Sequence, residues 1–102
     1  MPSPLRLKKQ RQRAKEVRKE VRRRERNRAI RSEARTLVTA ARTALEGDDR
    51  QAIDTAVFNA LVRLDTASSA GVLQKNNAAR RKSRLMKSFH IKFPGEPTPS
   101  SK

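Results

Sequence analysis

The residues of this chain best suited to chemistry are arginine and lysine, and they are concentrated in two blocks. Residues 1–35 hold 15 basic and 4 acidic side chains, and residues 75–92 hold 7 basic and none acidic. The intervening residues 36–74 hold 3 basic and 5 acidic side chains. Guanidinium and ammonium groups donate hydrogen bonds to phosphate oxygens. The formal net charge of +16 at pH 7 therefore predicts a polyanionic partner, most simply a nucleic acid.

Arginines of the first block recur at helical spacing. Arg24, Arg28, Arg31, Arg35 and Arg42 fall within about 60° on a helical wheel, beside the apolar stripe of the same segment. The alternative is a solvated charged face, but too few acidic residues are available to pair with these arginines. Phosphate contacts of this kind carry no sequence information. In this block the predicted nucleic-acid-binding residues are Arg11, Lys15, Arg18, Arg22, Arg24, Arg28, Arg31 and Arg35.

The second block contains the run Gln74–Arg84, in which basic residues alternate with amide, hydroxyl and small side chains. Small residues allow close approach of a backbone, while the polar groups offer hydrogen bonds. The run nearly matches the basic region of leucine-zipper transcription factors, because Asn76, Ser83 and Arg84 keep that spacing. Its alanine pair is one residue early, no leucine heptad follows, and Pro94 blocks a long coiled coil. We therefore reject the zipper interpretation.

Nothing in the sequence predicts catalysis or a cofactor. His90 is the only histidine, cysteine is absent, and the three glycines form no phosphate-binding loop. Asp48 and Asp49 are explained by helix capping rather than metal binding. We expect no enzyme activity, no metal, no cofactor and no small-molecule substrate.

The sequence also bears on location. No apolar run approaches the roughly 18 residues of a membrane span, so no membrane association is expected. An organelle transit peptide is the alternative for the arginine-rich start, but serine is scarce there and Glu16 and Glu20 interrupt the run. The absence of cysteine fits a cytosolic setting.

Periodicity predicts three helices, over residues 8–46, 49–69 and 73–90. Gly47 lies where a C-terminal cap is expected, and Asp48 or Asp49 can cap the second helix. Short turns between three helices predict an all-α, antiparallel three-helix bundle. The first helix, roughly 60 Å long, must overhang the other two. Its basic half, residues 8–28, has little to bury and is expected to fray without RNA.

The bundle core and the chain ends follow from the same patterns. Residues 1–7 are predicted to be flexible, and residues 93–102 form a disordered tail rich in proline and serine. Residues 8–92 would then make up the folded, RNA-binding domain. The residues expected to meet between the helices are Leu37, Val57, Leu61, Leu64 and Leu85.

The segment Glu46–Asp48 and above all the run Gly71–Leu85 (GVLQKNNAARRKSRL) resemble the S-twenty family of bacterial small-subunit ribosomal proteins. Gln74 stands where histidine is common in that family. The resemblance covers roughly residues 8–90 and implies a cytoplasmic, ribosomal protein that binds small-subunit ribosomal RNA and supports subunit assembly beside other subunit components. The family motif implies that the following residues bind RNA: Lys75, Asn76, Arg80, Arg81, Lys82, Ser83 and Arg84. Lys87 is predicted to bind RNA as well, because it lies on the same basic helix face as Arg80 and Arg84.

Two other classes of protein share the charge of this chain. One is a general DNA- or RNA-compacting basic helical protein, and the other is a basic scaffold that binds an acidic protein. Neither accounts for the run Gly71–Leu85. Selective protection of one ribosomal RNA site would separate the ribosomal interpretation from both.

Overall fold

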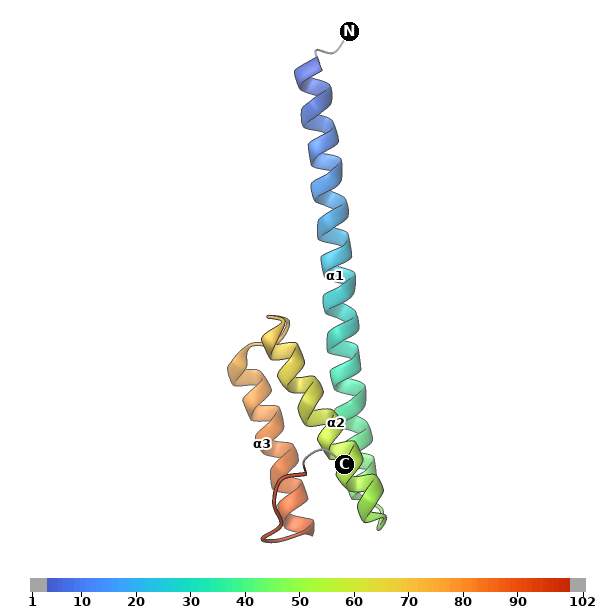
Figure 1. Ribbon diagram of the computed structural model, residues 1–102, viewed down its shortest axis with the longest axis vertical. Coiled ribbons are helices and arrows are strands. Elements are labelled where there is room, and N and C mark those ends of the chain that lie inside the picture. Colours follow the sequence, from blue (N-terminus) through green and yellow to red (C-terminus); the bar gives the residue numbers. More distant parts are fainter. Residues whose placement is uncertain (1–3, 100–102) are drawn as a thin grey trace.

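The protein is built from three helices, seen in a computed structural model that describes residues 4–99. They are α1 (Pro4–Leu45), α2 (Arg50–Ser69) and α3 (Lys75–Lys92). Successive helices run antiparallel, so α3 runs parallel to α1 (Figure 1). The molecule measures 74 × 22 × 20 Å because α1 extends far beyond the other two helices. The predicted all-α, three-helix fold with a long first helix is confirmed.

The length of α1 follows from its composition. No glycine or proline occurs between Pro4 and Gly47, and most residues there are strong helix formers. The helix begins at Pro4 rather than near residue 8, because a proline is tolerated in the first turn, where its missing N–H has no helical acceptor. Residues 4–7, expected to be flexible, are therefore helical, and residues 1–3 lie outside the described part of the chain.

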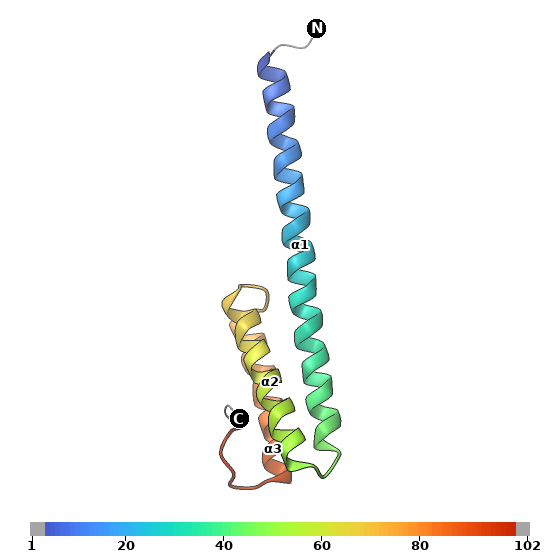
Figure 2. The same ribbon diagram turned by 45° about the vertical axis from the view of Figure 1, so that its right-hand side comes forward.

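The core lies where α2 and α3 pack against the C-terminal half of α1 (Figure 2). Small residues of α1 let α2 approach closely. The prediction for the core is confirmed: Val57, Leu61, Leu64 and Leu85 are buried, and Leu37 is partly buried. The central cluster consists of Ala34, Val38, Ala41, Ile53, Val57, Ala60, Leu61, Leu64, Leu85 and Phe89. Ala34 is the first of the described side chains of α1 to be buried, and every residue from Arg6 to Arg26, about six turns of helix, is exposed.

The turn between α1 and α2 is held by a cap and by a contact from α3. The carboxylate of Asp49 accepts a hydrogen bond from the Ala52 N–H at 3.2 Å, which confirms the predicted N-cap. Gly47 follows the last turn of α1 as expected, but its φ is not positive, so it does not form a left-handed cap. Instead, the Lys92 ammonium donates to the Gly47 carbonyl at 2.6 Å. The base of α3 thereby ties down this turn.

The turn between α2 and α3 is a Schellman motif centred on Gly71, whose φ is +76°. The Val72 N–H bonds to the Ala67 carbonyl at 2.9 Å, and the Gly71 N–H bonds to the Ser68 carbonyl at 3.0 Å. Val72 and Ala67 are both buried, which supplies the hydrophobic contact of this motif. The motif stops α2 and turns the chain back so that α3 can pack beside it.

We expect the two turn glycines to respond differently to alanine. Gly71→Ala should lower the free energy of unfolding by about 1–2 kcal/mol, because a Cβ is strained at positive φ even though it meets no atom within 4 Å. Gly47→Ala is the matched control, since its Cβ would lie an ordinary 3.5 Å from the Ala44 carbonyl oxygen. Chemical denaturation of both variants checks this. Equal stability of the two would show that Gly71 is not conformationally required.

The segment after α3 folds back on the base of the bundle. The guanidinium carbon of Arg50 lies 4.1 Å from the ring centroid of Phe93, whose ring lies 5.2 Å from that of Phe89. Arg50 also contacts Asp54 at 3.0 Å and Glu96 at 3.5 Å, and the hydrogen bond with Asp54 is the main cause of its raised pKa. The predicted disordered tail is thus packed over its first residues, because aromatic and charged groups there find partners on α2 and α3.

The overhanging half of α1 gives a test of local stability. In the RNA-free protein we expect amides of residues 8–28 to exchange rapidly with solvent and those of α2 to be protected, because only tertiary packing opposes fraying. Hydrogen exchange measured by mass spectrometry or NMR checks this. Protection of residues 8–28 equal to that of residues 34–45, which lie on the same helix, would contradict the expectation.

No helix among residues 4–99 combines the length and the apolar character that a membrane crossing requires.

Candidate nucleic-acid interface

The basic residues predicted on the first half of α1 project from a helix that nothing surrounds. From Arg6 to Arg26, every residue is exposed. Arg24 makes an ion pair with Glu20 at 2.9 Å, and the Nε of Arg18 donates to the Ala14 carbonyl at 3.3 Å. Both contacts join residues four apart on the same exposed helix, where such pairs contribute little stability. Most of the basic side chains between residues 8 and 26 are therefore accessible to a partner.

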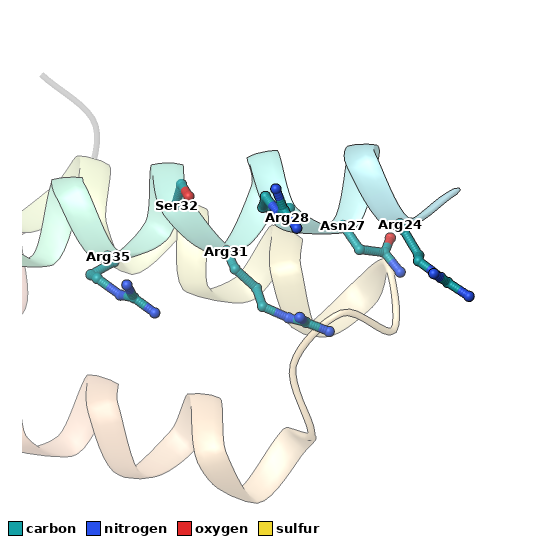
Figure 3. Close-up of a pocket in the computed structure, with 6 residues that line it drawn as sticks. All are labelled: Arg24, Asn27, Arg28, Arg31, Ser32 and Arg35. Carbon is teal, nitrogen blue, oxygen red and sulfur yellow. The ribbon is translucent and has the colours of Figure 1, made fainter. Parts of the chain in front are cut away.

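A shallow hollow of about 350 Å³ lies on α1 where the overhang enters the bundle. Figure 3 shows Arg31 and Arg35 extending from α1 on the side where α3 lies. Four arginines line the hollow. Within residues 4–99, Arg24 pairs with Glu20, and the other three form no ion pair. The residues that line the hollow are Arg24, Asn27, Arg28, Arg31, Ser32 and Arg35.

Sequence reasoning found the four arginines of this hollow but not Asn27 and Ser32. The amide and hydroxyl groups offer hydrogen bonds between the guanidinium groups. Helical spacing could have identified Asn27, because residues 24, 27, 28, 31 and 35 fall on one face of the helix. Four guanidinium groups over three turns, with little acidic compensation, make a local surface suited to phosphate groups. Arg42, predicted in the same series, is exposed but does not line the hollow.

The predicted residues of α3 divide into solvent-facing side chains and side chains with partners. Two have partners. The ammonium of Lys82 contacts Asp65 of α2 at 2.6 Å, and the Nε of Arg81 donates to Asn77 Oδ1 at 2.9 Å. The exposed residues for which the described part of the chain provides no side-chain partner are Lys75, Asn76, Arg80, Ser83, Arg84 and Lys87.

The contact between Lys82 and Asp65 fixes the rotation of α3 in the bundle. Since Lys82 lies on the flank of α3 that faces α2, Arg81 and Arg84 fall on the opposite flank, toward α1. Arg80 and Lys87 lie on the outer face, opposite the buried Leu85. Arg84 and the hollow of α1 therefore border the same side of the molecule, whereas Arg80 and Lys87 face outward.

Acidic side chains gather on the other side. Glu33 pairs with Arg63 at 2.9 Å, and Asp65 and Asp54 of α2 hold Lys82 and Arg50. The α2 side is thus close to electrical neutrality, whereas the α1–α3 side carries the excess positive charge. A polyanion is attracted to the second side and gains little from the first. No group of three or more histidine and acidic side chains within residues 4–99 gathers closely enough to hold a metal ion.

Known proteins resemble this chain over most of its length. Residues 8–90 match the family described as ribosomal protein S20. A protein of Thermomicrobium roseum is 48% identical over 77 residues, which cover 76% of this chain and 78% of the relative. A protein of Pseudarthrobacter chlorophenolicus is 52% identical over 62 residues (61% and 72%), and one of Coprothermobacter proteolyticus is 48% identical over 67 residues (66% and 76%). All three are named small ribosomal subunit protein bS20. The match extends from the basic overhang to the end of α3, and the chain belongs to the ribosomal protein S20 family.

Proposed function

We propose that this protein is a structural constituent of the small ribosomal subunit, that it binds small-subunit ribosomal RNA directly and that it supports assembly of the subunit. The observation that carries the proposal is an uneven balance of charge: cations on the α1 overhang, in the hollow and on the outer face of α3 far outnumber the acidic side chains near them, whereas both arginines of α2 pair with acidic groups. The names of the relatives point to the same particle. Its other partners would be neighbouring components of the subunit, in the cytoplasm.

The proposed mechanism is neutralisation of several phosphates with release of their counterions. Folded ribosomal RNA brings phosphates of different strands close together, and their repulsion opposes compaction. A rigid row of guanidinium groups reduces that repulsion without chemical change, so no catalytic residue or cofactor is required. A-form RNA hides its base edges in a deep, narrow major groove, and we therefore expect contacts with phosphates and 2′-hydroxyl groups to dominate.

The two parts of the surface have different roles in this proposal. The cations of α3 and of the hollow are held in place by the bundle, so they define how the protein is oriented on RNA. The overhang is held by helix formation alone and gains order as it binds. Lys82 is the predicted site residue with the weakest case, because Asp65 already holds its ammonium group.

Chemical footprinting on small-subunit ribosomal RNA tests the proposal, with large-subunit ribosomal RNA and duplex DNA of equal length as controls. Protection of a defined set of small-subunit nucleotides at about 0.2 M salt, and sedimentation with the subunit after a high-salt wash, are the expected results. Equal affinity for all three polyanions would instead identify a general nucleic-acid-compacting protein.

A further inference from the structure

The overhanging half of α1 carries an apolar stripe that no other part of residues 4–99 covers. Leu7, Val17 and Val21 are exposed over 42%, 59% and 45% of their surface, and Ala14 is exposed as well. On a helical wheel all four lie within about 40° of Val21. Single exposed apolar residues are ordinary, but a row of them along the most highly charged segment of the chain marks one face of the helix as different from the rest.

The two kinds of basic residue are sorted around this stripe. Between Pro4 and Arg22 the arginines lie about 60–100° from the stripe, on both of its sides, at positions Arg6, Arg11, Arg13, Arg18 and Arg22. The lysines of the same segment lie about 120° or more from it, on the back of the helix, at positions Lys8, Lys9, Lys15 and Lys19. The sorting holds for the first five turns of α1; nearer the bundle, Arg23 and Arg26 lie about 160° and 140° from the stripe, on the back of the helix.

The sorted arginines indicate what covers the stripe. Charge repulsion argues against a second copy of this chain, because each overhang is strongly basic. Guanidinium groups, unlike ammonium groups, bind phosphate in a planar, bidentate manner. Two arginine rows on a helix about 10–12 Å wide, with an apolar strip between them, fit a shallow trough that has phosphates on both edges and sugars on its floor. The minor groove of A-form RNA is wide, shallow and lined by ribose groups, whereas the major groove is too narrow for side chains to read.

We propose that the overhang of α1 lies lengthwise in the minor groove of an RNA duplex, with the apolar stripe on the riboses and one arginine row on each strand. This inference rests on the proposed function and specifies which RNA surface the overhang takes. The same helix face continues beyond Val21 as Arg24, Arg28, Arg31 and Arg35. The duplex thus follows one face of α1 and reaches the arginines of the hollow.

Matched charge removals in the full chain test the orientation. Arg11→Gln/Arg18→Gln removes two cations from one flank of the stripe, and Lys8→Gln/Lys15→Gln removes two from the back with the same seven-residue spacing. On an RNA duplex of about 20 base pairs, the flank variant should lose roughly tenfold more affinity and lower the salt slope by about two, whereas the back variant should leave the slope nearly unchanged. Equal effects of the two variants would overturn the proposed orientation.

The apolar stripe and the choice of groove need their own readouts. Val17→Gln/Val21→Gln keeps the charge and the helix propensity, so it should weaken binding severalfold without changing the salt slope. Methylation of the 2′-hydroxyls places methyl groups in the minor groove, and it should weaken wild-type binding to the duplex. Unchanged affinity for the methylated duplex would exclude the minor groove, and equal binding of the overhang to anionic phospholipid vesicles would identify a membrane-surface helix instead.

Failure of this inference is distinguishable from failure of the proposed function. If the flank and back variants behave alike while wild-type protein still protects a defined small-subunit site, only the orientation of the overhang is wrong. If wild-type protein does not prefer small-subunit ribosomal RNA, the proposed function itself is wrong. Circular dichroism of each variant should show the thermal unfolding of the parent, because the substituted side chains are exposed in the free protein.

Discussion

Leu64→Ala is expected to lower the free energy of unfolding by about 2–5 kcal/mol. Leu64 is fully buried at the centre of the cluster formed by the three helices, so its truncation removes apolar contacts and leaves a cavity. The net stability of a small domain is of the same order, at about 5–15 kcal/mol. The variant should therefore lose a large part of the stability of the domain. Urea denaturation followed by circular dichroism measures the change.

Val62→Ala provides the control for this prediction. It lies on the same helix, two residues earlier, but 40% of its surface is exposed. Removal of its two methyl groups leaves no enclosed cavity, so the change should stay within about 1 kcal/mol. A Leu64→Ala variant that unfolds at the same urea concentration as Val62→Ala would mean that the three helices do not pack around Leu64.

Arg80→Ala/Arg84→Ala and Arg31→Ala/Arg35→Ala are each expected to weaken binding to small-subunit ribosomal RNA by about tenfold per arginine. Each pair should also lower the salt slope by roughly two, one for each lost phosphate contact. All four side chains are exposed, and none forms an ion pair with another of residues 4–99, so the fold should not change. Filter binding or fluorescence anisotropy over a range of salt concentrations gives both quantities.

Arg63→Ala is the control for these arginine variants. Arg63 is also exposed but lies on α2, where it pairs with Glu33. Its loss should change the RNA affinity by less than twofold to threefold. The loss of affinity can be compared per charge removed. If it is as large for Arg63→Ala as for the α1 and α3 variants, RNA binding depends only on the total charge of the protein. An unchanged affinity for Arg80→Ala/Arg84→Ala would confine the binding surface to α1.

Much of the fold follows from the order of residues because helix formation and burial are periodic. The apolar stripe from Ile53 to Ala67 is buried as a unit. Asp49 starts α2 and Gly71 ends it, through hydrogen bonds that span only three to five residues. Such signals depend on local geometry, so they survive without knowledge of the neighbouring helices. Helix ends are less sharply determined, which is why α1 begins at Pro4 and α3 ends at Lys92.

The candidate interface is also only partly predictable from the sequence. Composition and helical spacing alone predict that α1 and α3 carry the excess charge and that Arg80 and Lys87 lie on the face of α3 opposite Leu85. They do not predict that Lys82 is held by Asp65, because the two residues are seventeen positions apart and meet only through the rotation of α3 against α2. The same is true of the Arg50 guanidinium at the start of α2, which stacks on Phe93 only after the chain has passed through one further turn and the whole of α3.

By itself, the sequence determined the number of helices, the residues of the core, the basic character of α1 and α3, and the likeness to a ribosomal protein family. Each of these depends on the identity of residues or on their spacing along one helix. Only the tertiary structure decided that Lys82 of α3 is held by Asp65 of α2 and that Lys92 ties down the turn at Gly47. Those features depend on the angle and offset between helices, which are set by how unlike side chains interlock across the core and are not encoded in the periodicity of any single segment.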